Sequence, residues 1–128
     1  MEFSFTKTIH ISFEEAIQKI TEALKAEGFG IITEIDMKST LKNKLDIDFY
    51  NYRILGACNP NFAYRALQAE DKIGLMLPCN VVVQEKNIGE VEISAINPTA
   101  TMRAIDNDDL HAVALEVSSS LKKVIDSM

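Results

Sequence analysis

Two cysteines carry the most reactive side chains of the sequence. Cys58 and Cys79 are the chain's two cysteines, and an asparagine follows each of them. Cys58 lies between a predicted strand and a predicted helix, whereas Cys79 follows Pro78 at a predicted strand irregularity. A thiol beside a helix N-terminus feels the positive end of the helix dipole, which favours the nucleophilic, metal-binding thiolate. We therefore take Cys58, Asn59, Cys79 and Asn80 as candidate site residues.

A plainer interpretation competes with this one, because cysteine is often buried as a small hydrophobic residue. By strict alternation Cys79 falls on the same side of its strand as Val81 and Val83. Core packing, a place in a ligand or metal pocket, and redox chemistry all stay open for both cysteines. The absence of a C-x-x-C motif excludes zinc-ribbon and thioredoxin-like sites, and His10 and His111 lack metal-site spacing.

Arg53 is a further candidate, because it lies inside an otherwise apolar stretch. A guanidinium there must pair with an acid or reach solvent. It could simply extend along the rim of the sheet. Alternatively, it could clamp an anion beside the helix that begins at Pro60, where a carboxylate or phosphate would also find free backbone amides.

Composition narrows the class of protein. The 128 residues suit one domain, residues 1–128, with 47% hydrophobic and 25% charged residues. Nineteen acidic against thirteen basic residues give a net charge of −6, which disfavours nucleic acid and anionic membranes as partners. No apolar run spans a bilayer and no secretion signal opens the chain, so we expect a cytoplasmic protein with free thiols.

Periodicity predicts the elements of the first half. Residues 3–11 alternate as in a half-buried strand, and Ser12 with Glu15 forms a capping box for a helix that ends near Gly28. We expect a second strand over residues 29–35, a short helix over 37–45 and a third strand over 49–57.

In the second half, Asn59 as N-cap and Pro60 at the first position predict a helix that ends near Ala69. Ile73, Leu75 and Leu77 alternate, which predicts a fourth strand that breaks at Pro78 and resumes over residues 81–84. A hairpin turn over 86–89 and a strand over 90–96 follow. Residues 98–108 should form a loop, and an amphipathic helix closes the chain.

The sum is an α+β fold: a two-layer sandwich with an about five-stranded, largely antiparallel sheet and helices on one face. The other face would carry Tyr50, Tyr52 and Ile54, with Met76 nearby. Such a surface is too apolar for open solvent, so we expect a homodimer to cover it.

Three segments, residues 52–60, 63–67 and 74–83, resemble the bacterial and archaeal family known as domain of unknown function 302. The resemblance covers nearly the whole chain. It implies a compact α+β fold that pairs as a homodimer, and no established activity. Within it the Cys-Asn-Pro and Pro-Cys-Asn segments look like the family signature, which marks Cys58, Asn59, Cys79 and Asn80 as the residues to test.

The leading functional hypothesis is a cytoplasmic homodimeric domain that binds a small anion or metabolite near the Cys-Asn-Pro helix start. Arg53, Cys58, Asn59, Cys79 and Asn80 are its candidate ligand-binding residues. One alternative is a thiol-dependent redox enzyme, or a thiolate metal site that uses Cys58 and Cys79. Another is a structural or interaction module. The sequence does not identify a cofactor or decide whether the protein is an enzyme.

Overall fold

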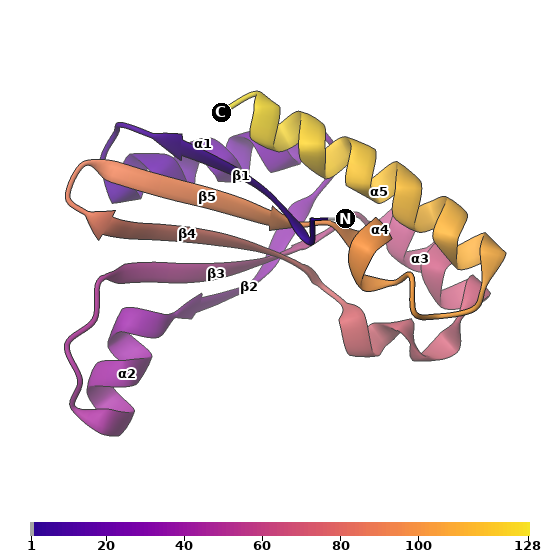
Figure 1. Cartoon of the computed structure of the whole chain (residues 1–128), viewed down its shortest axis with the longest axis horizontal. Coiled ribbons are helices and arrows are strands. Elements are labelled where there is room, and N and C mark those ends of the chain that lie inside the picture. Colours follow the sequence, from indigo (N-terminus) through magenta and orange to yellow (C-terminus); the bar gives the residue numbers. More distant parts are fainter. Residues whose placement is uncertain (1) are drawn as a thin grey trace.

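The computed structural model describes residues 2–128. Its five strands form one antiparallel sheet in the order β1-β5-β4-β3-β2 (Figure 1). The elements are β1 (Ser4–Ile9), α1 (Phe13–Ala26), β2 (Gly30–Asp36), α2 (Met37–Leu45), β3 (Asn51–Cys58), α3 (Pro60–Ala69), the 3-10 helix η1 (Asp71–Met76), β4 (Cys79–Asn87), β5 (Glu90–Ile96), α4 (Pro98–Thr101) and α5 (Asp108–Asp126). The predicted α+β class and the antiparallel five-stranded sheet are confirmed.

Helices α1 and α5 cover one face of the sheet, and α3 packs beside α5. The start of α1 is the predicted capping box. The Ser12 hydroxyl accepts a hydrogen bond from the Glu15 amide at 3.2 Å and donates one to the Glu15 carboxylate at 2.9 Å. The apolar stripe of α1 then packs Ile20 and Leu24 onto the sheet, both fully buried.

The core lies between these helices and the alternate residues of the strands. Phe5, Ala95, Val81 and Leu55 form one row across four paired strands, and all but Phe5 are at most 1% exposed. The next residue of each strand points to the opposite face. The register of the sheet therefore decides which side chains meet the helices and which do not.

Two predicted elements differ from the structure. Residues 73–77 were expected to form a strand, but η1 occupies Asp71–Met76, and the Glu70 carboxylate accepts a hydrogen bond from the Lys72 amide. Only Ile73 of η1 is buried, while Leu75 is 88% exposed. The expected loop after Pro98 also contains the short helix α4, and Met102 at its end is buried.

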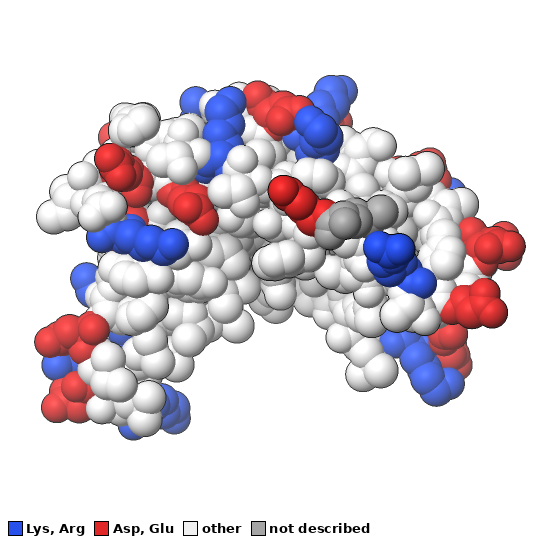
Figure 2. All heavy atoms as spheres, in the orientation of Figure 1, with Lys and Arg blue, Asp and Glu red and all other residues white. Residues whose placement is uncertain are grey.

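Within residues 2–128, the second face of the sheet has no helical layer over it. Its central row is Thr6, Ser94, Val82 and Ile54, none of which is fully buried. The molecule has the shape of an arch, and the hollow underneath shows few charged atoms between a lobe at α2 and a lobe at η1 (Figure 2). Within the described part of the chain, no helix has both the length and the apolar character that crossing a membrane requires.

Candidate functional site

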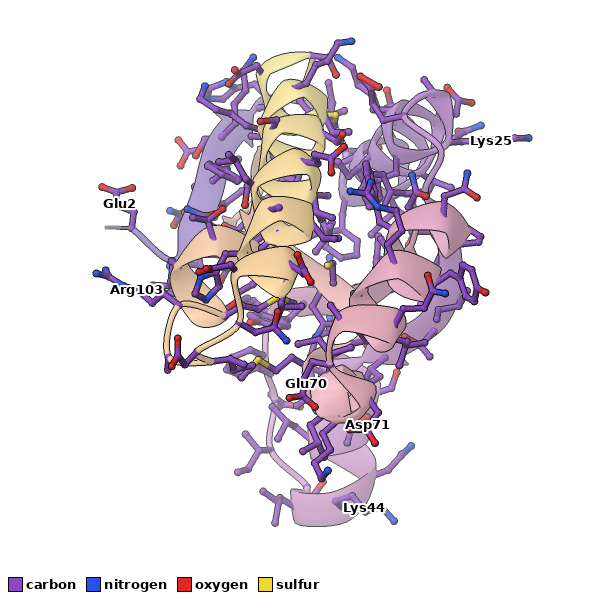
Figure 3. The ribbon with its side chains drawn as sticks, turned by 90° about the vertical axis from the view of Figure 1, so that its right-hand side faces the viewer. Glu2, Lys25, Lys44, Glu70, Asp71 and Arg103 are labelled. Atoms are coloured by element: carbon purple, nitrogen blue, oxygen red, sulfur yellow. The ribbon has the colours of Figure 1, made fainter. Side chains whose placement is uncertain are left out.

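A cavity of about 310 Å³ lies between α3, α5 and the end of the sheet where both Cys–Asn segments are found. Figure 3 shows the two helices next to each other, with side chains between them. The walls come from six separate stretches of chain. Large apolar side chains dominate this lining, among them Phe29, Phe62, Leu67, Leu77, Met102 and Leu110.

The lining of this cavity carries no charged side chain among the described residues. Within the described lining, polar side-chain atoms come from Asn59 and from the two cysteines alone. Pockets for small molecules are mostly apolar with a few polar groups that orient the ligand. An apolar lining of this kind favours the uptake of apolar molecules. The site can therefore hold an uncharged chemical group.

Asn59 is positioned by its own helix. It is the N-cap of α3, and its side-chain oxygen accepts hydrogen bonds from the amides of Asn61 at 3.1 Å and Phe62 at 3.3 Å. Its Nδ2 atom donates to the Glu27 carbonyl oxygen at 3.4 Å. Because Asn59 already uses these two amides, they are not open to an anion.

Cys79 begins β4 directly after the cis peptide bond between Leu77 and Pro78. Its side chain belongs to the core and is 8% exposed, on the same side of the strand as Val81 and Val83. Burial, with a smaller contribution from neighbouring Cys58, raises the pKa of the Cys79 thiol from 9.0 to about 11. The thiol is therefore protonated at neutral pH, which disfavours Cys79 as a nucleophile.

Cys58 lies beside Cys79 at the ends of two paired strands. Its neighbour Ala57 is the register partner of Cys79, and both cysteines line the same cavity as free thiols. Cys58 is partly exposed. In residues 2–128, no three His, Cys, Asp or Glu side chains cluster as a metal site would require. The structure thus brings the two cysteines together, in an apolar setting.

Gly56 lets the Pro78–Cys79 segment approach β3. A Cβ at this position would overlap Thr33 Oγ1 and lie 2.7 Å from Cγ of Pro78. Both contacts leave no room for any larger residue. Gly56 therefore fixes how closely the segment before β4 packs over the sheet.

The structure does not bring Arg53 to this site. Arg53 precedes Cys58 by five residues of strand, a separation of about 16 Å. Its guanidinium lies 5.3 Å from the Phe13 ring centroid and forms ion pairs of 3.2–3.7 Å with three carboxylates, those of Glu14, Glu34 and Asp36. The guanidinium thus meets the condition set for it by the sequence, to pair with an acid or reach solvent, through pairing with acids.

Asn80 lies outside the cavity. It is exposed on β4, faces the opposite side of the sheet from Cys79 and pairs with Gly56. It lines a second cavity, of about 270 Å³, which shares Leu77, Pro78 and Cys79 with the first. Of the five candidate residues, Cys58, Asn59 and Cys79 therefore line the larger cavity together, Asn80 lies behind it and Arg53 lies elsewhere.

An ion pair joins the two helices that wall the cavity. Arg65 of α3 donates a hydrogen bond to the Glu116 carboxylate of α5 and lies 5.9 Å from the Phe62 ring centroid. This hydrogen bond lowers the pKa of Glu116 and raises that of Arg65. The pair is exposed, so it orients α3 against α5 more than it stabilises the fold.

Sequence reasoning missed most of the cavity wall. Phe29, Phe62 and the α5 residues Val113 and Val117 fit ordinary amphipathic patterns and carry no signal of their own. They meet only because α3 packs on α5 across the sheet end. A pattern along one segment cannot show which side chains of distant segments it will contact.

Comparison with known proteins agrees with the architecture. Residues 5–128 match the family model "Domain of unknown function DUF302". The fold is similar to the crystal structure of an uncharacterized conserved DUF302 protein from Bacillus stearothermophilus, with 30% identity, a TM-score of 0.90 and coverage of 98% of each chain. No curated protein matches the sequence. Because the family model spans nearly the whole chain, the protein belongs to the DUF302 family.

Proposed function

We propose that this protein is a binding domain that holds a small apolar metabolite in the cavity between α3 and α5. The observation that carries the proposal is a cavity of about 310 Å³ with no charged lining residue, bounded by Cys58, Asn59 and Cys79. A concave, mostly apolar lining with a few polar groups is the composition typical of a small-molecule pocket.

The size of the cavity sets the size of the ligand. A dry apolar cavity of about 150 Å³ is large enough to bind benzene. The present cavity has about twice that volume. A two-ring aromatic group or a medium-length alkyl chain fits this space.

The apolar lining also refines the hypothesis of an anion at the helix start. Asn59 occupies the first amides of α3, and Arg53 is paired with Glu14, Glu34 and Asp36. Neither group is available to hold an anion inside the cavity. The buried part of the ligand is therefore uncharged.

The proposal includes a homodimer formed through the uncovered sheet face. Five apolar side chains around this face are 42% to 88% exposed. They lie on β2, at and just after the end of α2, and on η1: Ile35, Leu45, Ile47, Leu75 and Met76. Exposed apolar side chains at both ends of one hollow suit an isologous contact, in which each copy presents the same patches. Two free thiols suit the reducing cytoplasm as the working compartment.

Naphthylmethanol is a suitable probe, because it is uncharged, has two rings and fluoresces, and the protein contains no tryptophan to interfere. The wild-type protein should bind it saturably. Ala66→Leu, which places extra methyl groups in the cavity, should weaken binding by about tenfold or more, equivalent to about 1.4 kcal/mol.

The matched control is Ala112→Leu, the same substitution on the exposed side of α5, which should leave the affinity unchanged. Thermal melts establish that both variants fold, and Ala63→Val is a second, smaller filling of the same wall. Binding that none of the cavity variants weakens would place the probe elsewhere and refute the proposal.

A further inference from the structure

A groove of about 390 Å³ adjoins the cavity on the side of α1 and β2. The two spaces share Phe29, Ile32 and Cys58 as common wall residues. Ile32 is 61% exposed, so this side of the cavity borders solvent. A ligand that fills the cavity therefore has an outlet next to the end of α1.

Lys25 is the one charged residue that lines either space in the described chain. It lies in the last turn of α1, is exposed and forms no ion pair within residues 2–128. Figure 3 shows its side chain extending away from the helix into open space. The closest acid along the chain, Glu27, pairs instead with Lys123 at 3.0 Å. The Lys25 ammonium is thus available to a ligand group that emerges from the cavity.

The floor of the groove leaves room for such a group. Gly28 and Gly30 both line it. A Cβ at Gly30 would meet no atom within 4 Å, whereas one at Gly28 would lie 2.9 Å from Nδ2 of Asn59, so the open part of the floor is at Gly30. A polar head can lie there in contact with water, while the apolar part of the same molecule remains in the cavity. Ile32 and Cys58, which line both spaces, thus lie between the apolar cavity and the groove that Lys25 lines.

We infer that the ligand of this cavity is a monocarboxylic acid with an apolar body. Its ring system or alkyl chain would lie between α3 and α5, and its carboxylate beside Lys25. The inference rests on the proposed function, since it adds a head group to the apolar ligand proposed there. An amine of the same skeleton would meet the Lys25 ammonium with like charge, and an alcohol would gain nothing from it.

The test compares naphthoate with naphthylmethanol, which share a ring system and differ in charge. Lys25→Met should weaken naphthoate binding by about two- to fivefold, the range for an exposed ion pair, and leave naphthylmethanol binding unchanged. Raised ionic strength screens the ion pair, so it should reduce the difference in naphthoate affinity between the wild-type protein and Lys25→Met.

The control is Lys44→Met on α2, which alters the net charge equally; Figure 3 shows Lys44 at the far end of the molecule from Lys25. Lys44→Met should change neither affinity. Equal effects of the two lysine variants on naphthoate, with naphthylmethanol still bound and still sensitive to Ala66→Leu, would overturn the inference and leave the proposed function standing. Failure of both probes to bind the wild-type protein would overturn the two together.

Discussion

The two Cys–Asn segments have the same dipeptide and opposite structural roles. At the first, Asn59 is tied into the N-cap of α3 and Cys58 is partly exposed where the cavity meets the groove. At the second, Cys79 is buried in the core and Asn80 is exposed on the opposite face of the sheet. The difference arises because the first pair ends a strand and the second begins one. Both members of the first pair therefore line the cavity, whereas only Cys79 of the second pair does.

The largest expected effect concerns the glycine that brings the second segment over β3. Gly56→Ala should destabilise the protein by about 3 kcal/mol, because the new methyl group overlaps Thr33 and Pro78. Gly74→Ala in η1 is the matched control, since a Cβ there would meet nothing within 4 Å. Urea unfolding of both variants measures the difference. Equal stabilities would mean that the Pro78–Cys79 segment does not pack as closely as the structure has it.

The next largest expected effect is a loss of stability at high pH that depends on Cys79. The folded-state pKa of Cys79 is about 11 against 9.0 for an ordinary thiol, so between these values the unfolded chain releases a proton that the folded chain keeps. Stability is therefore full below pH 9.0 and falls as the pH rises toward about 11, by about 2 to 3 kcal/mol in total.

Cys79→Ala should remove this alkaline loss, and Cys58→Ala should retain most of it. Denaturant unfolding at a series of pH values, from neutral to about 11, compares each variant with the wild-type protein. The informative quantity is the difference between the curves, in which contributions common to all variants cancel. A wild-type curve parallel to that of Cys79→Ala would contradict a buried thiol at this position.

The smallest expected effect is the difference in stability cost between alanine substitutions of the two asparagines. Asn59→Ala should cost about 1 to 2 kcal/mol, because it removes the cap of α3 and the contact with the Glu27 carbonyl. Asn80→Ala should stay within about 0.5 kcal/mol, as expected for an exposed side chain. Thermal or urea unfolding checks both. If Asn80→Ala were the more destabilising substitution, the roles assigned to the two segments would be reversed.

Much of the fold could be predicted from local signals. The capping box at Ser12 and Glu15, the Asn59–Pro60 helix start and the stripe of α5 each depend on neighbours within one element. The alternation of Ile73, Leu75 and Leu77 was too short to distinguish a strand from η1. Only Ile73 is buried in η1, so the alternation of apolar residues along this segment did not correspond to alternating burial.

The candidate site was predictable only in part. Cys58, Asn59 and Cys79 were singled out as unusual residues and lie at one cavity. Arg53 was misleading because its neighbours in the sequence are apolar. The three carboxylates that pair with it come from other elements, α1 and β2. Phe62, Met102 and Val117 gave no functional signal, since the cavity exists only through packing between distant segments.

The most direct test of the central claim is a nuclear magnetic resonance titration of methyl-labelled protein with naphthylmethanol. Binding in the cavity predicts shifts for the methyl groups of Met102, Val113 and Val117, which line it. The methyl groups of Val82, on the uncovered face of the sheet, should stay unchanged as an internal control. Shifts confined to Val82 and its neighbours, or no saturable shift at Met102 and Val117, would contradict the account.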